Sequence, residues 1–202
     1  SFLFVPGNRP DRFAKAARSG ADAVVLDLED SVPLADKALA RQALATQWQT
    51  LIALDVPWIV RINDEDSAFW SDDLAAIGEL PGLAGVMVPK AERPGTLSRL
   101  HVTLGGLPVL PLIETAAGCH DVRALAAAPG VLRLALGHID FMADVGMTCD
   151  DQQSELVPLR FALALATREA GLASAIDGVT VQTNDEQRLR EDTLRARRFG
   201  FG

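Results

Sequence analysis

The segment AVVLDLED, residues 23–30, indicates the fold class of this chain. Apart from Asp27, its first six residues are apolar at both odd and even positions. A strand that is apolar on both faces is typical of a parallel sheet buried under helices. The segment VLRLAL, residues 131–136, has the same character. Both segments therefore predict an α/β fold built on parallel strands.

Strand-length apolar runs alternate with helical patterns along the whole chain, and the runs end in Gly, Pro, Asn or acidic residues. This alternation is typical of repeated βα units. Seven strands are predicted, at residues 2–5, 23–28, 58–62, 85–88, 109–113, 132–136 and 174–176. Helices are predicted at residues 10–18, 35–51, 72–79, 95–101, 118–127, 153–170 and 185–198.

Repeated βα units favour a closed barrel over an open sheet. A (β/α)8 TIM barrel needs eight strands and typically runs to about 250 residues. This sequence has 202 residues and seven predicted βα units. We therefore predict a single TIM-barrel domain over residues 1–202, with the C-terminal eighth strand and lid region missing from the sequence.

Composition excludes several classes of partner. The chain is 49% hydrophobic, which fits one globular domain. Its formal net charge is -8, which disfavours nucleic acid or an anionic membrane as a partner. No apolar stretch approaches the roughly 20 residues that span a bilayer, and no secretion signal is visible. We expect a cytoplasmic protein in which Cys119 and Cys149 are free thiols without a role.

Polar residues that directly follow predicted strands are the candidates for chemistry, because the active site of a TIM barrel lies at the C-terminal ends of its strands. Acidic residues dominate this set. Several carboxylates at one barrel mouth would repel each other without a cation, and hard oxygen ligands favour Mg²⁺ or Mn²⁺. The acidic and basic candidates are Glu29, Asp30, Arg61, Glu114 and Asp140.

Five motifs, in order, carry a resemblance to a known family. They are LFVPGNRPDRFAKAARSGADAVVLDLEDSV, VRIN at Val60–Asn63, VMVPKAE, PLIETAAG and LGHIDFMADVG. Together they resemble the citrate lyase β-subunit family, within the aldolase and citrate lyase superfamily, over nearly the whole chain.

The resemblance implies a site and a reaction. Glu114 and Asp140 would bind Mg²⁺, and Arg61 would bind the substrate carboxylate. The reaction implied is cleavage of a 3-hydroxyacyl thioester of CoA or of an acyl carrier protein, such as citryl-CoA, into acetyl-CoA and a 2-oxo acid. Glu29 and Asp30 are candidates for the general base, although a role in orienting metal waters or Arg61 is preferred. We also expect a homo-oligomer, with a trimer first, or membership of a lyase complex.

Other interpretations stay open at this point. The chain could be a class II aldolase acting on a free 2-oxo acid, or a catalytically silent paralogue that binds acyl-CoA. Ile139 stands where relatives usually have an acidic residue before the metal aspartate, which favours the silent paralogue. Glu114 and Asp140 could also be paired with protein cations, and Arg61 could balance the acidic residues of the DLED run.

Overall fold

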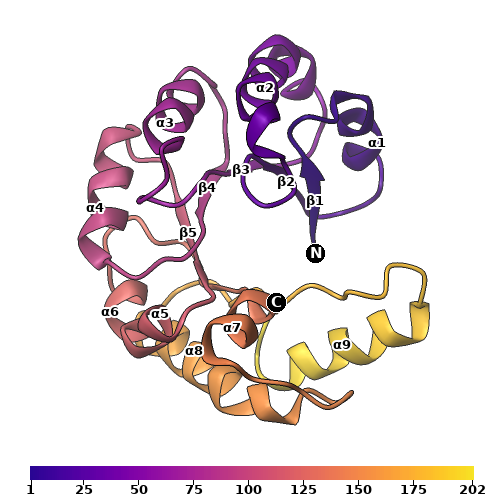
Figure 1. Ribbon diagram of the computed structural model, residues 1–202, viewed down its shortest axis with the longest axis vertical. Helices are drawn as coiled ribbons and strands as arrows, with labels where there is room; N and C mark the ends of the chain where they lie inside the picture. The colour runs from indigo at the N-terminus through magenta and orange to yellow at the C-terminus, as the bar shows by residue number, and fades with distance from the viewer. The chain divides into compact units, whose positions relative to one another are not determined.

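The computed structural model describes all 202 residues and confirms the predicted α/β class (Figure 1). The six strands are β1 (Phe2–Pro6), β2 (Ala23–Asp27), β3 (Trp58–Arg61), β4 (Gly85–Val88), β5 (Val109–Ile113) and β6 (Ala135–Leu136). The α-helices are α1 (Phe13–Ala17), α2 (Lys37–Leu51), α3 (Trp70–Gly78), α4 (Pro94–Thr103), α5 (Ala116–His120), α6 (Val122–Ala126), α7 (His138–Val145), α8 (Val157–Glu169) and α9 (Glu186–Arg198). Short 3-10 helices are η1 (Pro10–Arg12), η2 (Leu34–Asp36) and η3 (Ser154–Leu156).

The chain divides into two compact units, which are described separately. The first unit comprises Ser1–Pro89 and Leu100–Val109, and the second comprises Lys90–Arg99 and Leu110–Gly202.

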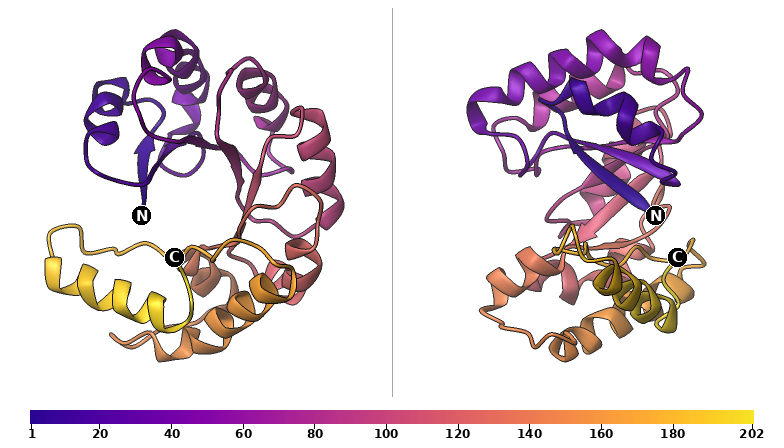
Figure 2. Two further views of the ribbon diagram at one scale, coloured as in Figure 1. Left: turned by 180° about the vertical axis from the view of Figure 1, so that it is seen from behind. Right: turned by 90° about the vertical axis from the view of Figure 1, so that its right-hand side faces the viewer.

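The first unit is built on a parallel sheet in which β1, β2, β3 and β4 are neighbours in that order. Helices α1, α2 and α3 lie on the same side of these strands (Figures 1 and 2). Every residue of β2, β3 and β4 is buried. The apolar character of the AVVLDL segment on both faces is explained by this burial.

Helix α2 packs through one face, on which Leu44, Trp48 and Leu51 are buried. Their spacing of four and three residues places them on one side of the helix. The Trp48 indole donates a hydrogen bond to the carbonyl of Pro81 (2.8 Å), and the Trp58 indole donates to that of Leu51 (2.9 Å). Each indole thus buries its ring and still satisfies its N–H, which ties α2 to the sheet.

In the second unit β5 pairs with β6 in parallel, with Ile113 opposite Leu136. The predicted seventh strand at residues 174–176 is reduced to a parallel bridge from Ile176 to Ala135, in which Ile176 donates a backbone hydrogen bond to Leu134 and accepts one from Leu136 (2.9 Å each). The strand predicted at residues 132–136 is confirmed only over Ala135–Leu136, the two residues that pair with β5.

Two helical features of the second unit also differ from the prediction. Helix α7 was not predicted; it ends at Gly146, which adopts a left-handed conformation (φ 66°) typical of a helix C-terminus. The single helix predicted at residues 118–127 is divided into α5 and α6 at Asp121, whose ψ of 12° departs from the helical value.

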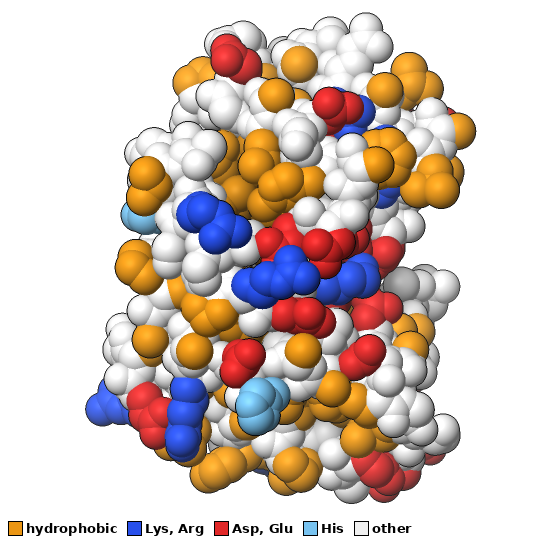
Figure 3. Space-filling view, turned by 60° about the vertical axis from the view of Figure 1, so that its left-hand side comes forward, with side chains coloured by type: hydrophobic (Ala, Val, Ile, Leu, Met, Phe, Trp, Pro, Cys, Tyr) orange, Lys and Arg blue, Asp and Glu red, His pale blue; other side chains and the backbone are white.

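On the face shown in Figure 3, Lys and Arg side chains lie next to Asp and Glu side chains. None of the helices has both the length and the apolar character needed to cross a membrane.

Candidate functional site

Arg61 and Asp27 form a buried ion pair at the C-terminal ends of β3 and β2. The two residues are opposite each other in the parallel register, so their side chains leave the sheet on the same face. Arg61 Nε donates to Asp27 Oδ1 (2.6 Å) and Nη2 donates to Oδ2 (2.7 Å). Such a two-pronged contact fixes the plane of the guanidinium as well as its position.

The environment of this pair keeps both partners charged. Burial alone favours a neutral Asp27, but the hydrogen bonds and charge of Arg61 outweigh it, helped by the Ser31 hydroxyl and the Glu29 N–H, and the pKa of Asp27 is lowered. Burial likewise opposes the charge on Arg61, yet Asp27, Glu29 and Asp30 raise its pKa. The sequence interpretation that Arg61 balances the DLED acids is confirmed by these contacts.

Glu29 and Asp30 also lie at Arg61 but in different environments. The Glu29 carboxylate is buried and lies 3.0 Å from Arg61 Nη1. The Asp30 carboxylate is 3.6 Å from the same nitrogen, and 54% of its side chain is exposed. The Phe4 ring lies 5.3 Å from Arg61 Cζ, within the range of a cation–π contact. Of the two predicted base candidates, Asp30 is the accessible one.

The sequence analysis included Asp27 only as one of the DLED acids and gave it no role of its own. The DLED run offers three acids within four residues, and the sequence alone does not say which of them faces Arg61. The signal that identifies Asp27 is the cross-strand register, which follows only from the pairing of β2 with β3.

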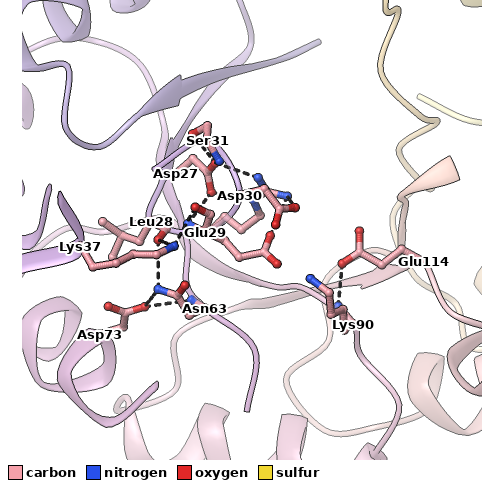
Figure 4. A network of polar contacts seen from close by, with 11 residues as sticks. Asp27, Leu28, Glu29, Asp30, Ser31, Lys37, Asn63, Asp73, Lys90 and Glu114 are labelled. Atoms are coloured by element: carbon pink, nitrogen blue, oxygen red, sulfur yellow. Dashed lines mark hydrogen bonds and ion pairs between the residues drawn. The ribbon is translucent and has the colours of Figure 1, made fainter. Parts of the chain in front are cut away.

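In the second unit, Glu114 directly follows β5, and its side chain packs against the backbone of Lys90 and Gly137. Its side chain is 1% exposed, and Oε1 accepts a hydrogen bond from the N–H of Lys90 (2.8 Å; Figure 4). Lys90 adopts a left-handed conformation (φ 46°), which is uncommon for a residue other than glycine and is found more often at functional positions. The other side of Glu114 faces Gly137, where a Cβ atom would lie 2.6 Å from that of Glu114.

Asp140 lies in the first turn of α7, three residues after Gly137. The N–H of Gly137 donates to the carbonyl of Ile113 (3.0 Å), so the start of α7 is joined to the end of β5. Later in α7, the Asp144 carboxylate accepts from the N–H of Ala116 (2.7 Å) at the start of α5. Glu114 and Asp140 therefore follow adjacent, paired strands, as the sequence predicted.

Glu114 and Asp140 are two carboxylates that follow the paired strands β5 and β6. Gly137, which has no Cβ atom, leaves room for the buried Glu114 carboxylate, and Asp140 is partly exposed. No group of three or more His, Cys, Asp and Glu side chains is arranged to hold a metal. A pair of carboxylates is nevertheless what Mg²⁺ commonly takes from a protein, its remaining positions being filled by water and substrate oxygens.

His138 is the first residue of α7, and its buried Nδ1 atom has no hydrogen-bond partner. Gly178 packs directly against the ring. Burial and the charge of Arg160 lower the pKa of His138.

The chain was compared with known families, proteins and structures. Residues 1–202 match the sequence profile of the family described as HpcH/HpaI aldolase/citrate lyase. A citrate lyase subunit beta-like protein from Deinococcus radiodurans is 36% identical over an alignment of 209 positions, which covers the whole of this chain and 72% of that protein. A (3S)-malyl-CoA thioesterase from Cereibacter sphaeroides is 30% identical over 201 residues, all of this chain and 70% of that protein.

A solved structure shows the same similarity in three dimensions. The citrate lyase beta subunit from M. tuberculosis, complexed with oxaloacetate and magnesium, superposes with a TM-score of 0.82 at 33% identity. The similarity covers 99% of this chain and 87% of that one.

Proposed function

This chain belongs to the HpcH/HpaI aldolase/citrate lyase family, and from that premise we propose that it is a Mg²⁺-dependent carbon–carbon lyase. The proposed reaction cleaves a 3-hydroxyacyl thioester, such as citryl-CoA, into acetyl-CoA and a 2-oxo acid. The family predicted from the five motifs is confirmed, and its relatives include a citrate lyase subunit beta-like protein and a thioesterase. Because these relatives are lyases and thioesterases, membership of the family makes this chain an enzyme. We also propose that its fold class is that of the (β/α)8 barrel.

The observation that carries the proposal is that Glu114 and Asp140 follow the paired strands β5 and β6. Lys90 N–H and Gly137 hold the Glu114 carboxylate at the end of β5, and the paired strand leads directly to Asp140. A structure of the relative from M. tuberculosis contains magnesium together with oxaloacetate, which is a 2-oxo acid. We therefore assign Glu114 and Asp140 as the metal ligands. When bound, Mg²⁺ supplies positive charge for the oxygens of a 2-oxo acid.

Arg61 is assigned to the substrate carboxylate. Its guanidinium is held by Asp27 and Glu29, so its plane is set before any substrate binds. Asp27 uses Nε and one hydrogen of Nη2, and Glu29 lies 3.0 Å from Nη1, so one N–H on Nη1 and one on Nη2 remain as donors to a carboxylate. A preorganised cation of this type stabilises the negative charge that develops during cleavage without a cost of reorganisation.

The remaining chemistry needs a group that accepts a proton. Cleavage begins when the 3-hydroxyl group loses its proton; its carbon becomes the ketone of the 2-oxo acid as the carbon–carbon bond breaks. The bonding electrons pass to the acetyl carbon as a thioester enolate, which then takes up a proton. We propose Asp30 rather than Glu29 as the base, because Glu29 is buried against Arg61 whereas Asp30 is exposed.

The experiment that tests the assignment is Glu114→Gln. We expect the affinity for Mn²⁺, measured by calorimetry in place of Mg²⁺, to fall by at least about 100-fold, and citryl-CoA cleavage to be lost. The matched control is Glu169→Gln, which changes the same functional group at a surface ion pair with Arg123. Metal binding and turnover that survive Glu114→Gln would disprove the assignment.

The named relatives favour a second candidate, hydrolysis of the thioester. A (3S)-malyl-CoA thioesterase covers the whole of this chain at 30% identity. The two reactions differ in their products, because a lyase releases acetyl-CoA and a 2-oxo acid whereas a thioesterase releases free CoA and an intact hydroxy acid. Incubation with citryl-CoA and (3S)-malyl-CoA, followed by chromatography of the CoA species, distinguishes them.

A further inference from the structure

A buried lysine contacts the backbone of the acidic loop, residues 28–31, which follows β2. Lys37, the first residue of α2, is only 4% exposed, and its Nζ donates to the carbonyls of Leu28 (2.7 Å) and Glu29 (2.8 Å; Figure 4). Burial lowers the pKa of Lys37, although the carboxylates of Asp27 and Glu29 oppose this effect. A desolvated ammonium that contacts two successive carbonyls restrains the peptide between them.

Asn63 makes a second contact with the same loop. Its Nδ2 donates to the carbonyl of Leu28 (3.0 Å) and to Asp73 Oδ2 (2.6 Å), and its N–H donates to the same Asp73 oxygen (2.8 Å). Asp73 is fully buried, and its other oxygen accepts from Arg41 (2.9 Å). Asp73 belongs to α3, so the position of Asn63 is fixed by its two hydrogen bonds to that helix rather than by the loop.

These contacts lie one residue from the groups that orient Arg61. The carbonyls of Leu28 and Glu29 flank the Glu29 side chain, whose carboxylate contacts Arg61 Nη1. The N–H groups of Glu29 and Ser31, in the same loop, donate to Asp27. A shift of this backbone would move both carboxylates that hold the guanidinium.

We propose that Lys37 and Asn63 are positioning residues, which hold the Leu28–Glu29 backbone so that Asp27 and Glu29 present Arg61 in the orientation that cleavage requires. This inference rests on the proposed function for its catalytic part. Its structural part, the restraint of the loop, stands on the hydrogen bonds alone and can be measured in the absence of turnover.

The test is Lys37→Met, which removes the ammonium and keeps an unbranched side chain in the buried site. We expect kcat/KM for citryl-CoA to fall by about tenfold or more, and the amides of Glu29 and Ser31 to exchange with deuterium at least about ten times faster. The amides of Val25 and Leu26, within β2, should not change. The control is Lys15→Met, the same substitution at an exposed lysine on α1.

Lys37→Arg retains a cation with N–H donors, and we expect it to recover part of both losses. Asn63→Ala should accelerate the same amides. Because both residues donate to the Leu28 carbonyl, the combined variant should show a loss smaller than the product of the two single losses.

The outcomes separate the two proposals. If the wild-type protein cleaves no thioester, the proposed function fails, and faster exchange in Lys37→Met still supports the restraint. If loop exchange and kcat/KM in Lys37→Met equal those of Lys15→Met, the positioning role is overturned. If Lys37→Met does not fold, Asn63→Ala is measured with the same readouts; unfolding of both variants would assign the two residues to stability alone and overturn the proposal.

Discussion

Gly137→Ala tests whether the space beside Glu114 is required for the candidate metal site. Gly137 lies between β6 and α7 with φ −102° and ψ 72°, so an alanine needs no left-handed backbone there. Its Cβ would nevertheless lie 2.6 Å from Glu114 Cβ and closer still to Oε2. The hydrogen bond from Gly137 N–H to Ile113 (3.0 Å) restrains the backbone from moving away. Because the position of the Glu114 Cβ is set by its own backbone, the backbone at Glu114 must shift together with the side chain.

The size of the effect follows from this overlap. Carbon atoms in contact are ordinarily about 3.5–4.0 Å apart, so one of the groups must move by roughly 1 Å. Overpacking of this kind costs about 1–3 kcal/mol, and each kcal/mol lowers the Tm by about 2–4 °C in a chain of this size. Displacement of a metal ligand by a comparable distance should reduce metal affinity by about 10- to 100-fold.

The assay is calorimetric titration with Mn²⁺, together with a thermal melt of the apoprotein. Gly78→Ala is the matched control, because a Cβ at Gly78, the last residue of α3, meets no atom within 4 Å. We expect that control to keep the wild-type metal affinity and Tm or to raise the Tm slightly. If Gly137→Ala bound Mn²⁺ as tightly as Gly78→Ala, the assignment of Glu114 as a metal ligand would be refuted.

Two further predictions concern buried ion pairs. The pKa of Asp27 is lowered, so its charge stabilises the fold above about pH 4, and this contribution is lost as the pH falls through the folded-state pKa. Asp27→Asn should lower the free energy of unfolding by about 3 kcal/mol at pH 6, and urea denaturation should show this difference shrinking at pH 3; a constant difference would contradict the argument. Arg160→Met should lower the free energy of unfolding by about 3–5 kcal/mol. The substitution leaves the Asp177 carboxylate, which lies 3.0 Å from Arg160 Nε and is only 9% exposed, buried without its cation. Adding Asp177→Asn should recover part of this loss, and a cost below about 1 kcal/mol for the single variant would show that the pair is dispensable.

Local patterns in the sequence were sufficient for most elements. The bounds of β4 and β5 agree with the prediction to the residue, and α9 begins within one residue of it. These segments are short apolar runs or a long helical pattern with clear ends, so the preference of each is expressed within its own residues. Family membership was predictable as well, because it rests on motifs and their order.

Elements that depend on distant partners were less predictable. The segment at residues 174–176 is apolar enough for a strand, yet it forms a single bridge. Helix α7 begins without a side-chain cap and is held partly by the contact of Asp144 with Ala116. Neither outcome follows from local preference, since each requires knowledge of what lies alongside.

For the candidate site, the sequence by itself determined which residue types gather at strand ends, namely Arg61 among acids in one unit and Glu114 with Asp140 in the other. Only the tertiary structure decided the partners. Asp27 faces Arg61 because the register of β2 and β3 makes them neighbours across 34 residues of chain. Gly137 makes room for Glu114 because β6 pairs with β5. Contacts of this kind depend on the pairing of separate strands, a long-range property that no local pattern specifies.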